Sequence, residues 1–213
     1  FEQELYSSFE GIVYDYPVKP FLESLRSQIP FFEPGEYVVV AMLSGGGKSY
    51  FSVGQLLYSA NQNIPSLLIN LEKAPKNTQK RMWQMECNMQ FQRNFSGMDI
   101  QEMMKLKAAW ERIKELPVRV VNPGPYLHSI VSEIRRHRYE RGIEFAVVDY
   151  AQLVYINGYK GGRVNELTEI SAMFRALSLE LGIPIIVLAQ VKQEVMQRPD
   201  KRAFMYDVAD CKN

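Results

Sequence analysis

Cysteine, net charge and long apolar runs are all scarce in this chain of 213 residues. Two cysteines, Cys87 and Cys211, cannot build a disulfide framework or a cysteine metal site, so we expect a reducing compartment. Lysine and arginine number 25 against 24 acidic residues, which excludes a general basic field but not a local basic patch. No apolar run approaches the roughly 18–20 residues of a membrane span, so we expect no membrane contact.

The chain starts at Phe1, without a methionine or a signal-like segment, so we expect it to be a piece of a longer protein. Its length is enough for one domain with a full core. Residues 1–20 show no clear hydrophobic period, and residues 21–27 are expected to form a short amphipathic helix. We interpret residues 1–30 together as a linker or docking segment. The domain itself is expected over residues 31–213.

Apolar runs and helical patterns alternate along the domain. Strands are expected at 37–43, 66–71, 117–121, 145–149 and 184–190, and helices at 48–61, 75–93, 98–116, 128–141 and 166–181. Several of the strands are apolar on both faces, which is typical of a strand covered on both sides. The sequence therefore predicts an α/β fold with a mostly parallel sheet and helices on both faces.

A glycine-rich segment follows the first expected strand. Gly45-Gly46-Gly47-Lys48-Ser49 lies between that strand and a helix, which is the context of a phosphate-binding P-loop. Backbone N–H groups of such a loop and the helix N-terminus bind phosphate, the lysine reaches the terminal phosphates, and the serine hydroxyl binds Mg²⁺. The consensus has glycine where Met42 stands, and the alternative is a flexible turn that happens to precede a lysine.

Three further polar residues follow expected strands. Glu72, Asp149 and Gln190 each lie at or just after a strand's carboxyl end, the edge at which parallel sheets bind ligands. Asp149 fits a Walker-B carboxylate that holds Mg²⁺, Glu72 a general base for the attacking water, and Gln190 a γ-phosphate sensor. The alternatives are a capping Asp, an exposed Glu and a satisfied buried amide.

Two segments in the second half of the chain are Val148-Asp149-Tyr150-Ala151-Gln152-Leu153 and Leu188-Ala189-Gln190-Val191. They resemble the Asp-Tyr-Leu-Gln-Leu and Leu-Ser-Gln-Leu segments of DnaB-type hexameric replicative helicases. The run from Gln197 to Arg202, with Asp207, is similar to the approach to the family's DNA-binding loop. Pro34-Gly35-Glu36 and Asn70-Leu71-Glu72 fit the same pattern.

The resemblance implies a RecA-like P-loop NTPase core that assembles as a ring, usually of six, with nucleotide at the subunit boundaries. It implies hydrolysis of ATP with Mg²⁺ to drive movement on single-stranded DNA, with primase and a helicase loader as further partners, in the cytoplasm of a bacterial cell or phage-infected host. The implied catalytic residues are Lys48, Glu72 and Gln190, and the implied metal ligands are Ser49 and Asp149. The implied nucleotide-binding residues are Ser44, Gly45, Gly46, Gly47, Lys48, Ser49, Tyr50 and Arg81.

Contacts with single-stranded DNA are expected from two basic segments. The candidates are Lys160, Arg163, Lys201, Arg202, Asp210 and Lys212. The family's DNA loop carries an arginine where Ala209 stands, and its arginine finger lies on a strand beyond Asn213. The family's primase-binding amino-terminal domain is not in this sequence, so we expect this stretch alone to hydrolyse ATP poorly.

Three functions are therefore open at this stage. The first is the motor domain of a replicative DNA helicase. The second is a RecA-like recombination or regulatory ATPase that binds DNA, or forms oligomers, without unwinding. The third is a degenerate module that holds nucleotide structurally, and the presence of Lys48, Ser49, Glu72 and Asp149 argues against it.

Overall fold

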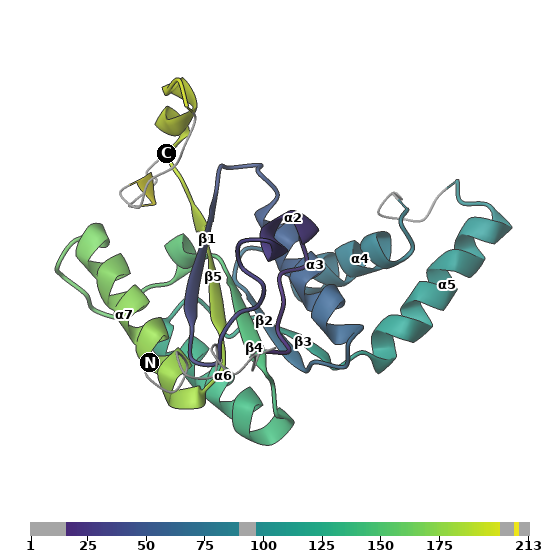
Figure 1. Ribbon diagram of the computed structural model, residues 1–213, viewed down its shortest axis with the longest axis horizontal. Helices are drawn as coiled ribbons and strands as arrows, with labels where there is room; N and C mark the ends of the chain where they lie inside the picture. The colour runs from purple at the N-terminus through teal and green to yellow at the C-terminus, as the bar shows by residue number, and fades with distance from the viewer. Residues whose placement is uncertain (1–15, 90–96, 201–206, 209–213) are drawn as a thin grey trace, which may run out of the picture.

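A computed structural model describes residues 16–89, 97–200 and 207–208 of the chain. Five parallel strands form one sheet in the order β1-β5-β4-β2-β3, with helices on both faces (Figure 1). The predicted sheet is therefore confirmed. In chain order the elements are α2 (Glu23–Arg26), β1 (Tyr37–Met42), α3 (Lys48–Ala60), β2 (Ser66–Asn70), α4 (Pro75–Glu86), α5 (Ile100–Glu115), β3 (Val118–Val121), α6 (Leu127–Arg141), β4 (Phe145–Asp149), the 3-10 helix η1 (Ala151–Leu153), α7 (Arg163–Leu181), β5 (Ile185–Gln190) and the 3-10 helix η2 (Gln193–Gln197).

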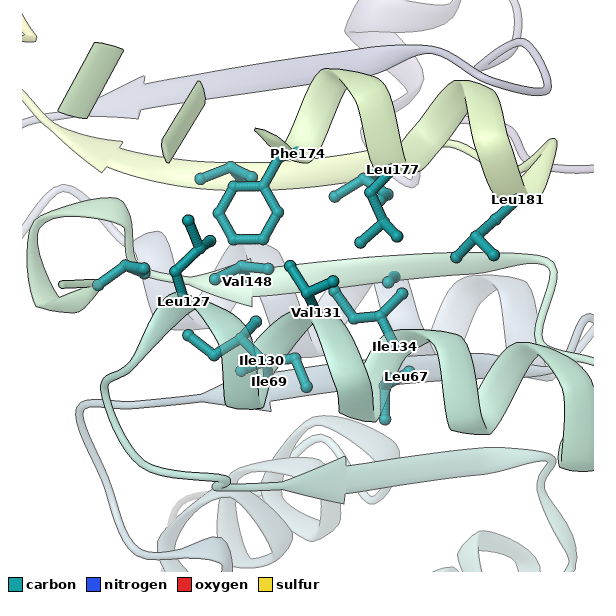
Figure 2. Packing of buried hydrophobic residues seen from close by; sticks show 14 of the residues in the cluster. Leu67, Ile69, Leu127, Ile130, Val131, Ile134, Val148, Phe174, Leu177 and Leu181 are labelled. Atoms are coloured by element: carbon teal, nitrogen blue, oxygen red, sulfur yellow. The ribbon is translucent and has the colours of Figure 1, made fainter. Parts of the chain in front are cut away.

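The three central strands send alternate side chains into two separate cores. Val148 and Val187 pack with the apolar faces of α6 and α7, where Phe174 is completely buried (Figure 2). Val147 and Leu188 face the opposite way and pack with α3. Because successive strand side chains point to opposite faces, continuous apolar strands fill both layers. This three-layer arrangement keeps the sheet rigid beneath its carboxyl-end loops.

The described part of the predicted linker segment packs against α3. The Phe21 ring lies so close to Gly54 that a Cβ there would meet it at 2.8 Å. The Gln55 side chain accepts a hydrogen bond from Phe21 N–H (3.0 Å) and donates one to Lys19 C=O (2.8 Å). Residues 16–30 are thus in contact with the domain core, while residues 1–15 lie outside the described residues.

Two helix boundaries differ from the prediction by three residues or more. Helix α4 ends at Glu86 instead of residue 93, because Asn88 has a positive φ of 50°, which breaks helical geometry. Helix α7 begins at Arg163, three residues earlier than predicted. No helix in the described part of the chain is both long and apolar enough to cross a membrane.

Candidate nucleotide site

The loop between β1 and α3 can form only with its glycines. Gly45 and Gly47 have φ values of 75° and 95°, a region that residues with a Cβ rarely adopt. A Cβ on Gly46 would lie 2.9 Å from Leu43 O, inside the turn that the Gly46 N–H closes onto the same oxygen. The loop ends at the first turn of α3. That turn has no acidic residue, so no side-chain carboxylate there would repel a bound anion.

Met42, the departure from the P-loop consensus, is the last residue of β1. It pairs in register with Gln190 of β5, and its C=O accepts a hydrogen bond from Val191 N–H at 3.0 Å. The loop thus starts directly beside the end of β5, despite the missing glycine. A flexible turn without a site does not explain this placement.

A cavity of about 470 Å³ opens at the carboxyl end of the sheet above this loop. Its walls come from five segments that are distant in sequence. Three cationic side chains and one carboxylate lie among them, which favours an anionic ligand. The lining residues are Ser44, Gly45, Gly47, Lys48, Ser49, Tyr50, Glu72, Lys73, Arg81, Tyr150 and Gln190.

Asp149 lies completely buried next to the first turn of α3. Ser49 and Ser52 both hydrogen-bond its carboxylate, Ser52 at 3.4 Å, but Oδ1 has no partner among the described residues. Burial raises the pKa of Asp149 above its ordinary value, and the Glu72 charge raises it further, while the two serines and Lys48 act against the increase. A buried carboxylate with an open oxygen beside a serine hydroxyl is a donor set that fits a hard divalent cation.

Glu72 is positioned by the buried residue Asn70 at the end of β2. The Asn70 side-chain oxygen accepts hydrogen bonds from the backbone N–H groups of Glu72 (3.2 Å) and Lys73 (3.0 Å). Its amide nitrogen donates to Thr78 on α4. This Asx turn directs the chain across the cavity and leaves the Glu72 side chain 39% exposed, where it can reach a water molecule.

Lys48 and Gln190 both line the cavity. Lys48 is 8% exposed, and its Nζ lies 5.2 Å from the centre of the Tyr150 ring. Such a contact holds the ammonium group in place without neutralising it. Gln190 ends β5, and its backbone is hydrogen-bonded by the Gln152 side chain.

The predicted nucleotide and catalytic residues thus gather at one place. All of them line the cavity except Gly46, which closes the loop turn, and Asp149, which lies behind Ser49. Sequence reasoning did not select Asn70, Lys73, Tyr150 or Gln152 as site residues. Asparagine directly after an apolar run is a turn signal that points to Asn70. Tyr150 and Gln152 lie in the segment of residues 148–153 that resembles the helicase family, but that resemblance gives them no role at the site. Lys73 has no local signal.

The DNA-contact candidates have different outcomes. Lys160 is exposed in the loop before α7. Arg163 is only partly exposed, and its guanidinium makes four internal contacts: it pairs with Glu166 at 2.6 Å, donates to two backbone carbonyls and lies over the Tyr155 ring. It holds its own loop in shape, so its expected DNA contact is not carried forward. Lys201, Arg202, Asp210 and Lys212 lie outside the described residues.

A parallel α/β sheet whose first strand runs through a glycine loop into a helix carrying Lys48 and Ser49 defines a P-loop NTPase fold. The DnaB-like helicase C terminal domain family matches residues 18–213, and the chain belongs to this family. Its sheet and helices are those of the RecA-like ATPase domain of DnaB-like helicases. The expectation from the sequence is therefore confirmed for both fold and family.

Individual relatives agree with this assignment. The replicative DNA helicase DnaB of Geobacillus stearothermophilus is 29% identical over 185 residues, which cover 84% of this chain and 40% of that protein. A solved DnaB-like replicative helicase, described with its interactions with primase, superposes with a TM-score of 0.87 at 21% identity, covering 98% of this chain and 52% of that one. A second solved structure, described as an ATPase domain, superposes with a TM-score of 0.86 at 22% identity, covering 97% of this chain and 75% of that one. The chain thus spans about two fifths of the curated relative's length.

Proposed function

We propose that this chain is the ATP-hydrolysing motor domain of a replicative helicase that moves along single-stranded DNA and unwinds duplex at a fork. The observation that carries the proposal is the cavity at the carboxyl end of the sheet. It combines a phosphate-binding loop, a lysine, a serine backed by a buried carboxylate, and an exposed glutamate. A structural nucleotide module needs only the loop and the lysine.

The loop and α3 supply the triphosphate site. Backbone N–H groups at the start of α3 face the anion, and the Lys48 ammonium, held over Tyr150, neutralises the terminal phosphates. Ser44, Gly45, Gly47 and Tyr50 form the wall around it. Arg81 extends from α4 into the same cavity and adds positive charge where negative charge develops in the transition state.

Ser49 and Asp149 would hold Mg²⁺. When bound, this ion would neutralise negative charge on the phosphate oxygens. The open Oδ1 of Asp149 and the serine hydroxyl are the oxygen ligands that fit it. Without a cation, burial raises the pKa of Asp149, because the charged form of this carboxyl is unfavourable in the apo site. Ser52 keeps this carboxylate oriented toward Ser49.

Glu72 and Gln190 complete the reaction. Glu72 accepts the proton of the attacking water, and the Asn70 turn holds its backbone for this role. Gln190 donates from its amide to the γ-phosphate and loses this partner on hydrolysis. Because Gln190 ends β5, that loss acts directly on the segment that follows.

Several parts of the proposal concern the intact protein. We assign it single-stranded DNA as substrate, self-assembly into a ring of six subunits, and primase and a loader as partners, in the cytoplasm of a bacterial cell or phage-infected host. Family membership supports these assignments, together with the DnaB-like structure described with primase. Lys160 is the described residue that we retain as a DNA contact, a local and salt-dependent one.

The test is strand displacement on a forked duplex by the intact protein with ATP and Mg²⁺, alongside ATPase measured with and without single-stranded DNA. The expected result is unwinding that requires ATP, with ATPase stimulated by the DNA and absent in Lys48→Ala. ATPase without any strand displacement favours instead the RecA-like recombination or regulatory ATPase. No nucleotide binding by the wild-type protein contradicts both.

A further inference from the structure

The end of β5 extends past its neighbour β4. The two strands pair from Ala146↔Ile185 to Val148↔Val187, whereas pairing of β5 with β1 continues to Gln190. On the β4 side, the N–H and C=O of Gln190 therefore face a position that no strand of the described chain occupies. Backbone groups at a partly buried strand end need partners from outside the ladder.

The Gln152 side chain occupies that position. Its Nε2 donates to Gln190 O at 3.0 Å, and its Oε1 accepts from Gln190 N–H at 3.1 Å. A primary amide carries the same donor and acceptor as a peptide group. Gln152 thus replaces the missing rung of the β4–β5 ladder with a side chain.

A third side-chain hydrogen bond joins Gln152 to residue 208, which comes later in the chain. The same Nε2 donates to Val208 O at 3.2 Å. Next to it, the backbone C=O of Asp207 accepts a hydrogen bond from Lys192 N–H (3.2 Å), and the Asp207 carboxylate forms a bidentate pair with Arg198 at 2.7 Å for both bonds. Both amide hydrogens of Gln152 are therefore engaged, one on each segment.

Gln152 itself is held from the other side. Its backbone C=O accepts from Arg163 at 2.9 Å, and Arg163 pairs with Glu166, which also accepts the Ile156 N–H at 2.7 Å. These contacts anchor η1 on the first turn of α7. The amide thus extends from a fixed base, which a side chain needs if it is to position another residue.

We propose that Gln152 is a positioning residue that fixes Gln190 at the nucleotide cavity and ties it to the segment of residues 207–208. Gln152 does not line the cavity, so it acts through Gln190. The inference rests on the proposed ATPase function. It predicts that the Gln152 amide governs turnover while nucleotide affinity stays constant.

Two substitutions at Gln152 test the inference in the intact protein. Gln152→Met keeps the length of the side chain and removes its three side-chain hydrogen bonds to Gln190 and Val208. Gln152→Glu keeps the acceptor for Gln190 N–H but places a carboxylate oxygen against two carbonyls, so it separates the donor from the acceptor role. Gln101→Glu, on the exposed face of α5, makes the same charge change far from the cavity and serves as the control.

The expected result for both Gln152 variants is a kcat lowered at least about tenfold, a factor that corresponds to about 1.4 kcal/mol of barrier, with KM and the Kd for ATP within about twofold of wild type. Gln101→Glu behaves as wild type. A kcat within about twofold of wild type in both Gln152 variants overturns the inference. A role confined to folding lowers the melting temperature without this split between kcat and KM, and overturns it too.

Hydrogen exchange tests the Gln152 clamp, which we define as the side-chain hydrogen bonds from Gln152 to Gln190 and Val208, separately from catalysis. We expect backbone amides at residues 190–192 of Gln152→Met to exchange at least about tenfold faster than in wild type, with the α6–α7 core unchanged. Unchanged exchange there removes the clamp, whatever the ATPase result. If instead wild type shows the clamp by exchange but never hydrolyses ATP, the proposed function fails while the structural claim stands.

Discussion

Replacing Asp149 with asparagine should separate the stability of the domain from its nucleotide chemistry. The Asp149 carboxylate is completely buried, and one of its oxygens has no hydrogen-bond partner in the part of the chain that the structure describes. Burial and the Glu72 charge raise its pKa above the ordinary value of 3.8. An asparagine side chain would keep the shape and one acceptor for the serines while removing the charge. We therefore expect the substitution to stabilise the apo protein and to abolish turnover.

The direction of the pKa shift gives the sign of the expected stability change. A carboxyl whose folded pKa is raised stabilises the fold fully below its unfolded pKa, and this contribution is lost as pH rises through the folded pKa. Ionisation of Asp149 thus destabilises the apo protein. An unpartnered buried polar atom costs about 1–3 kcal/mol, and more when charged, whereas a neutral amide leaves part of that cost in place. We expect a net gain of about 1 kcal/mol, which raises the melting temperature by about 2–4 °C for a chain of this size.

Thermal unfolding with and without ATP and Mg²⁺ measures both effects at once. A ligand at about a hundred times its Kd stabilises the folded state by about 2.7 kcal/mol, and we expect Asp149→Asn to lose most of this increment. The stability difference between variant and wild type should also shrink as pH falls toward 3.8. An apo variant less stable than wild type, with the full increment from nucleotide and metal, refutes the reasoning.

Four other substitutions test the site. Lys48→Ala should lower ATP affinity and turnover at least about a hundredfold by removing the phosphate charge, and unchanged ATPase would contradict this. Glu72→Gln should keep the Kd for ATP and lower kcat by about 10²–10⁴, whereas full turnover would move the base elsewhere. Gly46→Ala should destabilise the domain by about 1–3 kcal/mol in urea titration, because its Cβ would meet Leu43 O at 2.9 Å; an unchanged midpoint would show that the loop adapts. Asn70→Ala should lower kcat about tenfold by releasing Glu72, with the exposed Asn77→Ala as control, and equal rates in both would remove the positioning role.

The fold was predictable because its signals are local. The apolar runs of β4 and β5 are buried on both faces, and the glycine loop is found between a strand and a helix as expected. Asp99 caps α5 in a capping box with Glu102, a pattern visible in four residues. The end of α4 was placed too late, because a helical hydrophobic pattern continues past the turn at Asn88 that ends the helix.

The site was predictable where its residues follow strands. The carboxyl ends of parallel strands meet at one edge, which brought together Lys48, Glu72 and Gln190 from the sequence alone. The hydrogen bonds of Gln152 to Gln190 were not predictable, because they depend on the pairing with β4 stopping before β5 ends. The sequence shows Arg163 only as a basic residue in a loop. Its four contacts in the structure show that it holds this loop in shape.

The central claim is that residues from position 48 to position 190 surround one triphosphate. A structure of the intact protein with Mg²⁺ and a non-hydrolysable ATP analogue tests it most directly. We predict phosphates against the loop of residues 45–49, the metal beside Ser49 and Asp149, and Glu72 and Gln190 facing the γ-phosphate. A nucleotide bound elsewhere, or one whose γ-phosphate points away from Glu72, would contradict the account.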